Sequence, residues 1–497
     1  MLLIVVIYFA CALLLTIYGI NAHVLIHLYK RRYPRRRFLD QRVLDTFYGK
    51  RPPYDANSGA AVKLPTVTTQ VPVFNELNVA ERIIDAVAAL QYPAGRHEIQ
   101  VLDDSTDESY DLISNKIRLL RRQGIDIHHI RRNDRSGFKA GALHYGLECA
   151  RGDFVAIFDA DFMPPPDFLL RSMPFFLTDS RLGIVQGRWG HLNETESWIT
   201  RLQALGIDGH FMIEQGARST SRLWMNFNGT AGVLRKTAIV DAGGWQADTL
   251  TEDMDLSYRL QLRGWHSHYI VDLVAPAEIP SDLNGFKSQQ FRWAKGSIQT
   301  AIKLMPSIWR SNQNAFVKLQ ATLHLTHYLI HPLMLLIAVL APFLMLIKSP
   351  FLTGIGLIGF GILLLLSCTG PSRMYLVAGR TLGRPSIKTI LLLPLMVCFG
   401  CGLAVNNSRA IIEALLGISS AFVRTPKNGL IRKKTYRISR SPLIVLELLT
   451  GVWCLFGVGL YFNSQHYLIG HFMLIYAVGF LSIGGLSWWH SHDNATR

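Results

Sequence analysis

The sequence carries little charge. Asp, Glu, Lys and Arg make up only 17% of its 497 residues, against 49% apolar residues. This composition excludes a disordered or acidic solvating protein. Acidic residues are scarcer than basic ones, 35 against 51, which gives a net charge of +16. The basic residues mostly flank long apolar runs, a pattern typical of membrane proteins. No zinc-finger, helix-turn-helix or RNP-like aromatic motif is present, so we expect no nucleic-acid partner.

Cysteine is also rare. The six Cys residues are scattered, and five of them lie within apolar runs. Cys398 and Cys401 have no second Cys pair to complete a metal site. The sequence therefore predicts neither a disulfide framework nor a structural zinc.

Long apolar runs are absent between residues 30 and 318, which predicts one large soluble block. The run before it, 1–29, is long enough to span the hydrocarbon of a bilayer. Its basic residues follow at 30–37. A cleaved signal peptide is the alternative, but there the charge usually precedes the run. We favour an uncleaved span, which puts residue 38 onward in the cytoplasm.

After residue 318 the apolar runs return. We expect spans at 324–347, 351–369, 442–462 and 467–489. The stretch 387–422 has basic residues on both sides, so a single simple span does not fit it. We interpret it as a bent, re-entrant or interfacial segment, with break points at Pro394, Gly400 and Gly402. This makes five spans, with six as the alternative.

The predicted domains are thus a transmembrane helix at 1–30, a cytoplasmic domain at 38–310 and a membrane region at 318–490. Within the soluble block, strand-like stretches alternate with helix-like ones. The strands are expected at 67–73, 99–102, 127–130 and 154–158, and the helices at 79–90, 110–123 and 140–150. Such alternation predicts an α/β fold with a mostly parallel sheet and helices on both faces.

Acidic clusters follow two of these strands directly. Asp103 and Asp104 come after the strand 99–102, and Asp159 and Asp161 come after 154–158. Ligands of such sheets bind beyond the carboxyl ends of the strands. Paired carboxylates suit Mg²⁺ or Mn²⁺, which neutralises a diphosphate. The alternative is a turn that uses Asp for local hydrogen bonds.

With a third acidic motif, Thr251-Glu252-Asp253, and the motif Gln289-x-x-Arg292-Trp293, the sequence resembles the family 2 glycosyltransferases of the cellulose-synthase superfamily. Longer strings resemble the cellulose-synthase-like mannan and glucan synthases. They begin at Val71, Gln100, Lys139, Phe227 and Glu252. The resemblance is strong over about 65–310 and looser in the membrane region. It implies a GT-A-type nucleotide-sugar-binding domain inserted between transmembrane helices.

The resemblance also implies roles on the donor side. Asp103 or Asp104 is expected to contact the nucleoside of a sugar nucleotide, and Asp159 and Asp161 to hold Mg²⁺ or Mn²⁺ on its diphosphate. Two further residues are expected near the donor phosphates. They are Lys139, whose alternative is an ordinary helix-start lysine, and Arg292 of the Gln-x-x-Arg-Trp motif, which binds the diphosphate.

Asp253 is the expected general base, which takes a proton from the acceptor hydroxyl as that oxygen attacks the anomeric carbon with inversion. Asp255 is expected to point elsewhere on the helix. The residues expected to contact the acceptor are Asn228, Gly229, Thr230, Glu252, Gln289 and Trp293.

The string 422–427 resembles the gating loop of bacterial cellulose synthases, with Arg424 in place of an aliphatic residue. It lies in the segment 387–436, which we expect to carry both the interfacial part and the gate. The resemblance implies that Thr425 and Lys427 contact the donor. A basic juxtamembrane turn is the alternative.

We therefore expect a processive, metal-dependent, inverting hexosyltransferase that extends a β-linked polysaccharide and moves it across a bacterial inner membrane. The donor is expected to be UDP-glucose or, second, GDP-mannose. The partners are the nascent β-glycan, the lipid bilayer, and regulatory or export subunits. A single-sugar transferase acting on a lipid is the first alternative, and a non-enzymatic transporter is the second.

Overall fold

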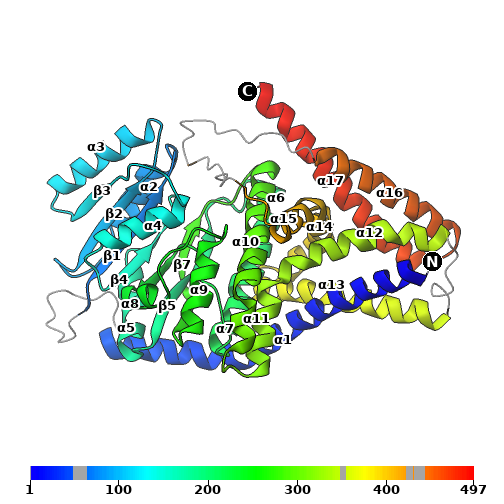
Figure 1. The fold of residues 1–497 in the computed structure, drawn as a ribbon, viewed down its shortest axis with the longest axis horizontal. Helices are drawn as coiled ribbons and strands as arrows, with labels where there is room; N and C mark the ends of the chain where they lie inside the picture. The colour runs from blue at the N-terminus through cyan, green and yellow to red at the C-terminus, as the bar shows by residue number, and fades with distance from the viewer. Residues whose placement is uncertain (1, 49–63, 347–353, 421–428, 430–442, 497) are drawn as a thin grey trace.

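The computed structural model describes all residues except 1, 49–63, 347–353, 421–428, 430–442 and 497. An α/β domain occupies one end of the molecule, and long apolar helices from both ends of the chain gather at the other end (Figure 1). The α/β fold and the flanking apolar helices predicted from the sequence are both confirmed.

A seven-stranded sheet forms the centre of the α/β domain, with strand order β3-β2-β1-β4-β6-β5-β7. The strands are β1 (Val67–Val73), β2 (His97–Asp103), β3 (Ile127–Ile130), β4 (Phe154–Ile157), β5 (Leu182–His191), β6 (Gly232–Arg235) and β7 (His266–Ala277). All neighbouring strands run parallel except β6, which is antiparallel to both β4 and β5. The mostly parallel sheet is therefore confirmed, and all four predicted strands are present.

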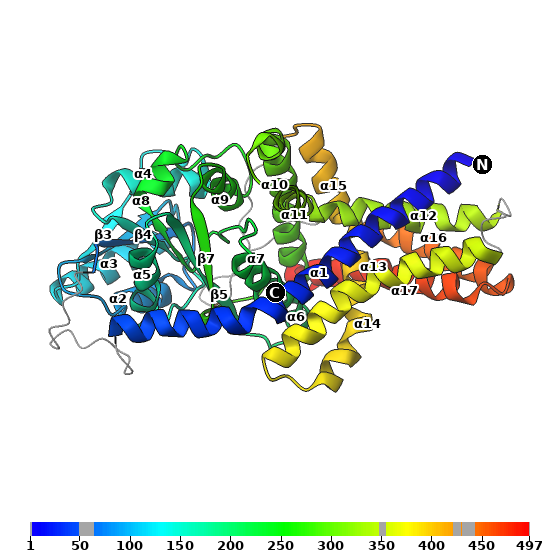
Figure 2. The ribbon, with the colours of Figure 1, turned by 90° about the horizontal axis from the view of Figure 1, so that it is seen from below.

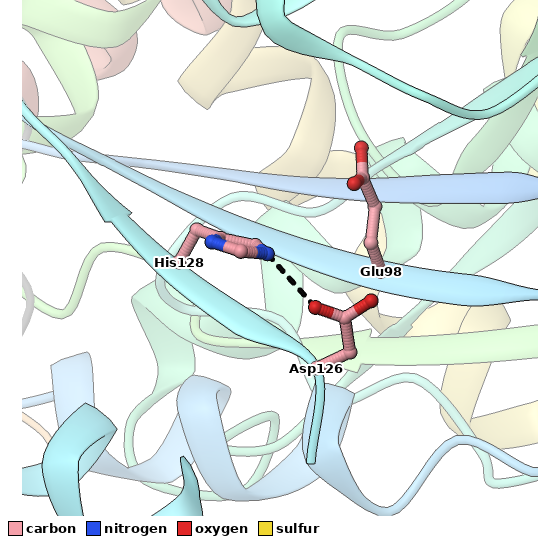
Figure 3. Close-up of side chains that lie close together, drawn as sticks. All are labelled: Glu98, Asp126 and His128. Atoms are coloured by element: carbon pink, nitrogen blue, oxygen red, sulfur yellow. Dashed lines mark hydrogen bonds and ion pairs between the residues drawn. The ribbon is translucent and has the colours of Figure 1, made fainter. Parts of the chain in front are cut away.

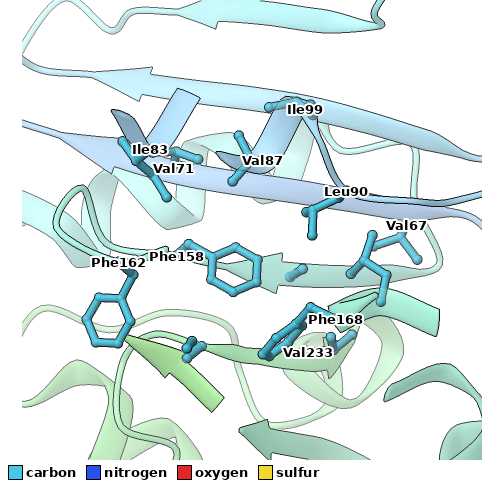
Figure 4. Close-up of a cluster of buried hydrophobic side chains, with 14 of the residues drawn as sticks. Val67, Val71, Ile83, Val87, Leu90, Ile99, Phe158, Phe162, Phe168 and Val233 are labelled. Carbon is cyan, nitrogen blue, oxygen red and sulfur yellow. The ribbon is translucent and has the colours of Figure 1, made fainter. Parts of the chain in front are cut away.

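Helices cover the sheet on both faces because its strands are apolar on both sides. Those of the first half are α2 (Ala80–Ala88), α3 (Ser109–Arg122), α4 (Phe138–Cys149) and α5 (Phe168–Thr178). Later ones are α6 (Trp198–Asp208), α7 (Gly216–Thr220), α8 (Lys236–Asp241) and α9 (Glu252–Leu262). Figure 4 shows the core on one face, where Ile83 and Val87 of α2 meet Val71 of β1, and Phe158 meets Phe168 edge to face. This packing holds the strand ends that carry the acidic clusters.

The first helix, α1 (Leu2–Tyr48), is longer than the predicted span at 1–30. It continues through the basic run and lies along the α/β domain, as both ribbon views show (Figures 1 and 2). Val43, Leu44 and Tyr48 pack against the core of the sheet, and the Tyr48 hydroxyl donates to the Leu170 carbonyl. The helix continues because its second part has an apolar face to bury, which the sequence pattern of charges did not indicate.

Five described helices are long and apolar enough to cross a membrane. Their apolar parts are Leu2–Tyr48, His327–Leu346, Gly361–Thr381, Ile444–Asn463 and Tyr467–His490. They belong to α1, α12 (Ile330–Leu346) with its preceding turn, α13 (Gly354–Thr381), α16 (Ile444–Asn463) and α17 (Tyr467–Thr496). The chain is thus a multi-pass membrane protein. The third span lies further along the chain than the predicted 351–369, because α13 continues to Thr381 past Arg373 and Arg380.

The predicted bent segment is a pair of helices, α14 (Ser386–Gly402) and α15 (Ala404–Leu415), which meet at an angle of 40°. If this pair counts as one span, the number of spans is six. The break lies at Leu403, and α14 continues through Pro394 and Gly400. Of the predicted break points, only Gly402 lies beside the bend. There its Cβ position is filled by the Gly479 carbonyl of α17, 2.4 Å away, so close helix packing requires glycine.

The helix α10 (Leu283–Arg310) joins the α/β domain to the membrane helices, with α11 (Ala315–Leu325) following it. Lys287 of α10 donates to both carboxylate oxygens of Glu447 in α16, at 2.6 and 2.8 Å, and to the Ser487 hydroxyl of α17. Their side chains are only 3% and 0% exposed. A buried ion pair of this kind is costly to break because one charge is left without compensation.

We therefore predict that Lys287→Met lowers the stability of the purified protein by about 3–5 kcal/mol. Removing both charges, in Lys287→Met with Glu447→Leu, should restore most of it. Thermal unfolding in detergent measures both effects. Lys116→Met, which breaks the partly exposed Lys116–Asp85 pair, is the control and should cost about 1 kcal/mol or less. Equal losses in the single and double variants would contradict the prediction.

Candidate functional site

A cavity of about 210 Å³ opens at the carboxyl ends of β1, β2 and β4, where parallel sheets bind ligands. It gathers residues from every motif singled out in the sequence and described in the structure. The expected site residues that line it are Asp104, Lys139, Asp159, Asp161, Asn228, Gly229, Glu252, Asp253, Gln289, Arg292 and Trp293. Two other expected residues, Asp103 and Thr230, lie directly behind its wall. Thr425 and Lys427 lie outside the described residues.

Of the first acidic pair, Asp104 faces the cavity and Asp103 is buried in the fold. Asp104 lines the cavity and accepts two hydrogen bonds from the Arg132 guanidinium, at 2.9 and 2.6 Å. Asp103 is buried and accepts from His129 and from the Ser105 backbone, both at 2.8 Å. Burial opposes the charge on Asp103, but these hydrogen bonds outweigh it and lower its pKa. Of the two, Asp104 is the one with access to a ligand.

Lys139 lines the cavity and contacts two of its motifs. It stands in the first turn of α4, and its ammonium group donates to Asp159 and, at 2.9 Å, to the Gly229 carbonyl. The Glu252 carboxylate is 4.0 Å away. Burial disfavours the charged form, but Asp159 and Glu252 outweigh it and raise the pKa of Lys139. Lys139 thus contacts the motif formed by Asp159 and Asp161, the Asp-x-Asp motif. A lysine that only begins a helix would not need such a contact.

The loop 226–230 contacts both Asp159 and Asp253, and so lies between the second and the third acidic motif. Gly229 has φ of +77°, and a Cβ there would meet Asp253 Oδ2 at 2.9 Å and Lys139 Nζ at 3.3 Å. The Thr230 hydroxyl accepts from the Asp159 backbone N–H at 2.9 Å, so Thr230 positions the Asp-x-Asp motif from behind. The close approach of this loop to Asp253 therefore requires glycine.

Glu252 and Asp253 begin α9 and face the cavity. Asp253 Oδ1 accepts from the Met254 backbone N–H at 2.8 Å, while Oδ2 faces Gly229. Burial and the neighbouring Glu252 charge raise the pKa of Asp253 to about 7, and burial also raises that of Glu252. Asp255 points away from the cavity, as predicted from the sequence, and pairs with Arg259 and Lys303.

The helix α10 supplies the remaining expected residues. Gln289, Arg292 and Trp293 line the cavity on one side of the helix. Burial lowers the pKa of Arg292, and the charges of Glu252 and Asp159 oppose that shift. Trp293 lies 6.4 Å from Trp189, measured between ring centroids. A guanidinium and an indole therefore meet at the junction between the acidic cluster and an aromatic wall.

A second cavity, of about 390 Å³, continues from this junction. Six residues line both cavities: Trp189, Ile207, Asn228, Thr251, Asp253 and Trp293. Its far wall comes from the membrane helices, with Ile330 of α12, Tyr375 of α13 and Phe399 of α14. Asp253, whose pKa is raised, therefore lies at the junction of the two cavities. The first is the polar cavity in the α/β domain, and the second is the larger cavity among the apolar helices.

The aromatic wall of the cavity was not predicted from the sequence. Trp189, at the end of β5, stacks on Phe211 at 4.9 Å and meets Phe162 edge to face. Two charged residues were not predicted either: Arg132, which holds Asp104, and Glu278, which pairs with Arg82 at 2.7 Å and lines the cavity. None of these residues lies in a motif, and their neighbours in space are distant in sequence.

The charges of the first cavity favour a bound cation. Its lining contains seven carboxylates, Glu76, Asp104, Asp159, Asp161, Glu252, Asp253 and Glu278, against three basic residues, Arg135, Lys139 and Arg292. Arg132 and Arg82, which lie outside the lining, pair with Asp104 and Glu278, so the lining keeps an excess of 5 − 3 = 2 acidic groups in a partly buried site, where like charges repel strongly. The hard carboxylate oxygens of Asp159 and Asp161 fit Mg²⁺ or Mn²⁺ by their chemistry.

Another cluster of metal-ligand types lies at the opposite end of the strands. Glu98, Asp126 and His128 offer ligand atoms within 4.8 Å of one another (Figure 3). However, Arg151 donates to Glu98 and, at 2.6 Å, to Asp126. The cationic guanidinium already compensates both carboxylates, so this cluster is explained as an ion-pair network.

We predict that Gly229→Ala lowers activity at least about tenfold while the protein still folds, because the added methyl group would displace Asp253 and Lys139 and strain the backbone. Gly264→Ala is the matched control. It has a similar φ of +83°, but a Cβ there meets nothing within 4 Å. Initial rates and thermal unfolding of both variants check this, and equal activity in the two would contradict it.

Comparisons with known proteins agree with the geometry. Residues 65–296 match the family described as glycosyltransferase-like family 2, and residues 232–369 match the cellulose synthase family. The resemblance predicted from the sequence is therefore confirmed for these residues.

Similar proteins include a probable glucomannan 4-beta-mannosyltransferase 7 of Oryza sativa subsp. japonica, 44% identical over 47% of this chain and 40% of that protein. Glucomannan 4-beta-mannosyltransferase 2 of Arabidopsis thaliana is 40% identical over 55% of this chain and 52% of that protein. The matched part thus spans about half the length of these relatives. Among solved structures, the mannosyltransferase PcManGT from Pyrobaculum calidifontis, in complex with GDP-Man and Mn²⁺, aligns with a TM-score of 0.44 and 18% identity, over 81% of this chain and all of that one.

Proposed function

We propose that this chain, whose residues 65–296 belong to the family 2 glycosyltransferases and whose residues 232–369 match cellulose synthases, is a membrane-embedded hexosyltransferase that extends a β-linked mannan or glucomannan. The observation that carries the proposal is the position of Asp253. It lines both the acidic cavity of the α/β domain and the cavity among the membrane helices. One carboxyl group therefore faces the expected sites of both donor and acceptor.

The proposed donor is a nucleotide-activated mannose, with GDP-mannose preferred over UDP-glucose. The sequence alone favoured UDP-glucose first. The names of the similar plant proteins, which are mannosyltransferases, support the opposite order. Asp104 is the proposed contact for the nucleoside, and Lys139 and Arg292 for the diphosphate. The proposed contacts of Thr425 and Lys427 with the donor stay a prediction, since both residues lie outside the described part of the chain.

In the proposed reaction, Asp253 Oδ2 takes the proton from the acceptor hydroxyl as that oxygen attacks the anomeric carbon. The bond from the anomeric carbon to the diphosphate breaks, and the configuration at this carbon inverts. Asp159 and Asp161 would hold Mg²⁺ or Mn²⁺, which would supply positive charge for the leaving diphosphate. Lys139 and Arg292 donate hydrogen bonds to the same phosphate oxygens. Trp293 offers its ring face to the terminal sugar of the acceptor, and Gln289, Glu252, Asn228 and Gly229 surround it.

The second cavity supports an acceptor that is a chain rather than a single sugar. Its volume of about 390 Å³ lies within the range of small-molecule sites, and it leads from Asp253 toward the membrane helices. We propose that the product chain enters it and crosses the bilayer through it. A single-sugar transferase with a lipid acceptor is the alternative that such an apolar wall also fits.

The proposed domains are those of the sequence analysis, with the catalytic domain at 38–310 on the cytoplasmic side and the membrane region at 318–490. The expected bacterial inner membrane finds no support in the similar proteins quoted above, which are from plants. Regulatory or export subunits stay a prediction.

Incubating the purified protein with Mg²⁺ or Mn²⁺ and labelled GDP-mannose or UDP-glucose tests the proposal. We expect a polymer that β-mannanase digests, formed from GDP-mannose. A labelled glycolipid would favour the lipid-acceptor alternative. No product from either donor, with or without added oligosaccharide, would contradict enzymatic function and favour the transporter.

Asp253→Asn should lower the transfer rate by about 10²–10⁴-fold while donor binding is retained, because the amide cannot take a proton. Since the pKa of Asp253 is raised to about 7, the free carboxyl is mostly protonated below pH 7 and is a competent base above it. The rate of the parent protein should therefore rise from pH 6 to pH 8, with an inflection that moves lower when the cation binds.

Rates measured across this range for the parent protein and for Asp253→Asn check both statements. Asp248→Asn, at an exposed carboxylate, is the control. Substantial turnover by Asp253→Asn would assign the base to another carboxylate.

Asp159→Ala and Asp161→Ala should each abolish the dependence of donor affinity on Mg²⁺ or Mn²⁺, and transfer with it, because each removes an oxygen ligand. Calorimetric titration of the donor with and without the cation measures this. Asp126→Ala, in the other acidic cluster, is the control and should leave the cation dependence intact. A loss in Asp126→Ala alone would move the cation to that cluster.

A further inference from the structure

The wall of the second cavity contains a seven-residue π-helix, Gly209–Gln215, between α6 and α7. π-helical turns are rare and frequently occur at functional sites. Their wider turn brings residues four and five positions apart onto neighbouring places on one face. Here the polar side chains His210, Glu214 and Gln215 all act on one another or on the loop 226–230. Hydrogen bonds join His210 to Glu214, and join both His210 and Gln215 to Asn228.

His210 is held in one tautomer. Its Nδ1 lies 2.9 Å from Glu214 Oε2, and a carboxylate can only accept, so Nδ1 carries the proton. Arg218, which is fully buried, donates to the other oxygen of Glu214 at 3.0 Å. Burial opposes the charge on Glu214, but Arg218 and His210 outweigh it and hold its pKa well below the usual range. The imidazole is therefore anchored by a charged carboxylate, and its Nε2 is an acceptor.

Asn228 is held from two sides by the same π-helix. Its Oδ1 accepts from Gln215 Nε2 at 2.8 Å, and its Nδ2 donates to His210 Nε2 at 3.4 Å. Its backbone N–H donates to Gln186 at 3.1 Å. These bonds fix which end of the amide is the donor. Asn228 lines both cavities, so its orientation decides what an acceptor meets between Asp253 and the membrane helices.

We propose that His210 is a positioning residue for the saccharide acceptor. Anchored by Glu214, it orients Asn228 toward the terminal sugar, and the free polar atoms of the Asn228 amide meet the sugar hydroxyl groups. The inference rests on the proposed function, and it extends it by naming the polar feature that recognises a hydroxyl-rich chain in a mostly apolar cavity. His210 itself lines that cavity, with 29% of its side chain exposed.

Two substitutions of His210 separate the effect of its hydrogen bonds from the effect of its size. His210→Phe keeps a ring but removes both hydrogen bonds. His210→Gln keeps a donor for Glu214 and an acceptor for Asn228. Substituting Glu214 is less informative, because it leaves the buried Arg218 without its carboxylate partner. His144→Phe, at an exposed histidine of α4, is the matched control.

The full chain, in detergent with Mn²⁺ and GDP-mannose, is assayed in two ways. One measures transfer to added β-manno-oligosaccharides over a range of concentrations, and the other measures nucleotide release without acceptor. We expect His210→Phe to raise the acceptor KM about tenfold, because Asn228 loses its fixed orientation and with it a hydrogen bond to the acceptor. Donor KM and acceptor-free nucleotide release should stay within about twofold of the parent. His210→Gln should recover most of the acceptor affinity.

Binding of the same oligosaccharides without donor tests the inference independently of turnover. It is measured as a change in the tryptophan fluorescence of the protein, to which Trp189 and Trp293 in the cavity walls contribute. If the parent protein binds oligosaccharide but transfers nothing, the proposed reaction fails and the role of His210 is still measured. Unchanged oligosaccharide affinity in His210→Phe, equal losses in donor and acceptor parameters, or no oligosaccharide binding by the parent would each overturn the inference.

Discussion

The contacts of Lys139 are the interaction on which the rest of the site depends. The ends of a parallel sheet bring carboxylates from separate strands and from α9 to one place, where their mutual repulsion would be severe in a partly buried cavity. A single ammonium group joins Asp159, the Gly229 carbonyl and, more distantly, Glu252. It thereby fixes the loop 226–230 against the Asp-x-Asp motif. That loop in turn sets the space in front of Asp253, where a side chain in place of Gly229 would strain the backbone and crowd the Asp253 carboxylate.

The remaining excess of negative charge is what makes the cavity suited to a cation and a diphosphate. The protein as a whole is strongly basic, at +16, yet the lining of this cavity is acidic. A divalent cation would balance the carboxylates, and the diphosphate that accompanies it would pair with Lys139 and Arg292. Burial, together with the neighbouring Glu252 charge, raises the pKa of Asp253 to about 7 and so prepares it to exchange a proton near neutral pH.

The helix α10 connects this chemistry to the membrane helices. Within 28 residues it carries Lys287, paired with Glu447 of α16, then the cavity residues Gln289, Arg292 and Trp293, and then Lys295, paired at 2.8 Å with Glu413 of α15. Two buried lysines therefore bracket the site residues and attach them to the apolar helices on either side. Because α10 is one continuous helix, a shift of the membrane helices relative to the α/β domain would move Arg292 and Trp293 with it.

Much of this protein follows from local sequence patterns. Three features were predicted because periodicity and short motifs are local properties. They are the alternation of strands and helices between 67 and 158, the placement of Asp104, Asp159 and Asp161 at strand ends, and a bent segment within 387–422. The expected site residues that the structure describes lie at one cavity or directly behind it, since the ends of parallel strands converge at one edge of a sheet.

Only the tertiary structure decided the rest. The basic run after the first span indicated an end at residue 30, but the helix continues to Tyr48 because its last turns bury Val43 and Leu44 against a sheet formed much later in the chain. Trp189, Arg132 and the π-helix with His210 and Glu214 belong to no motif, and their partners are set by the meeting of distant segments. Asp103 is buried against His129, whereas Asp104 pairs with Arg132 and lines the cavity. Tertiary packing decides this difference, and a single sequence does not show it.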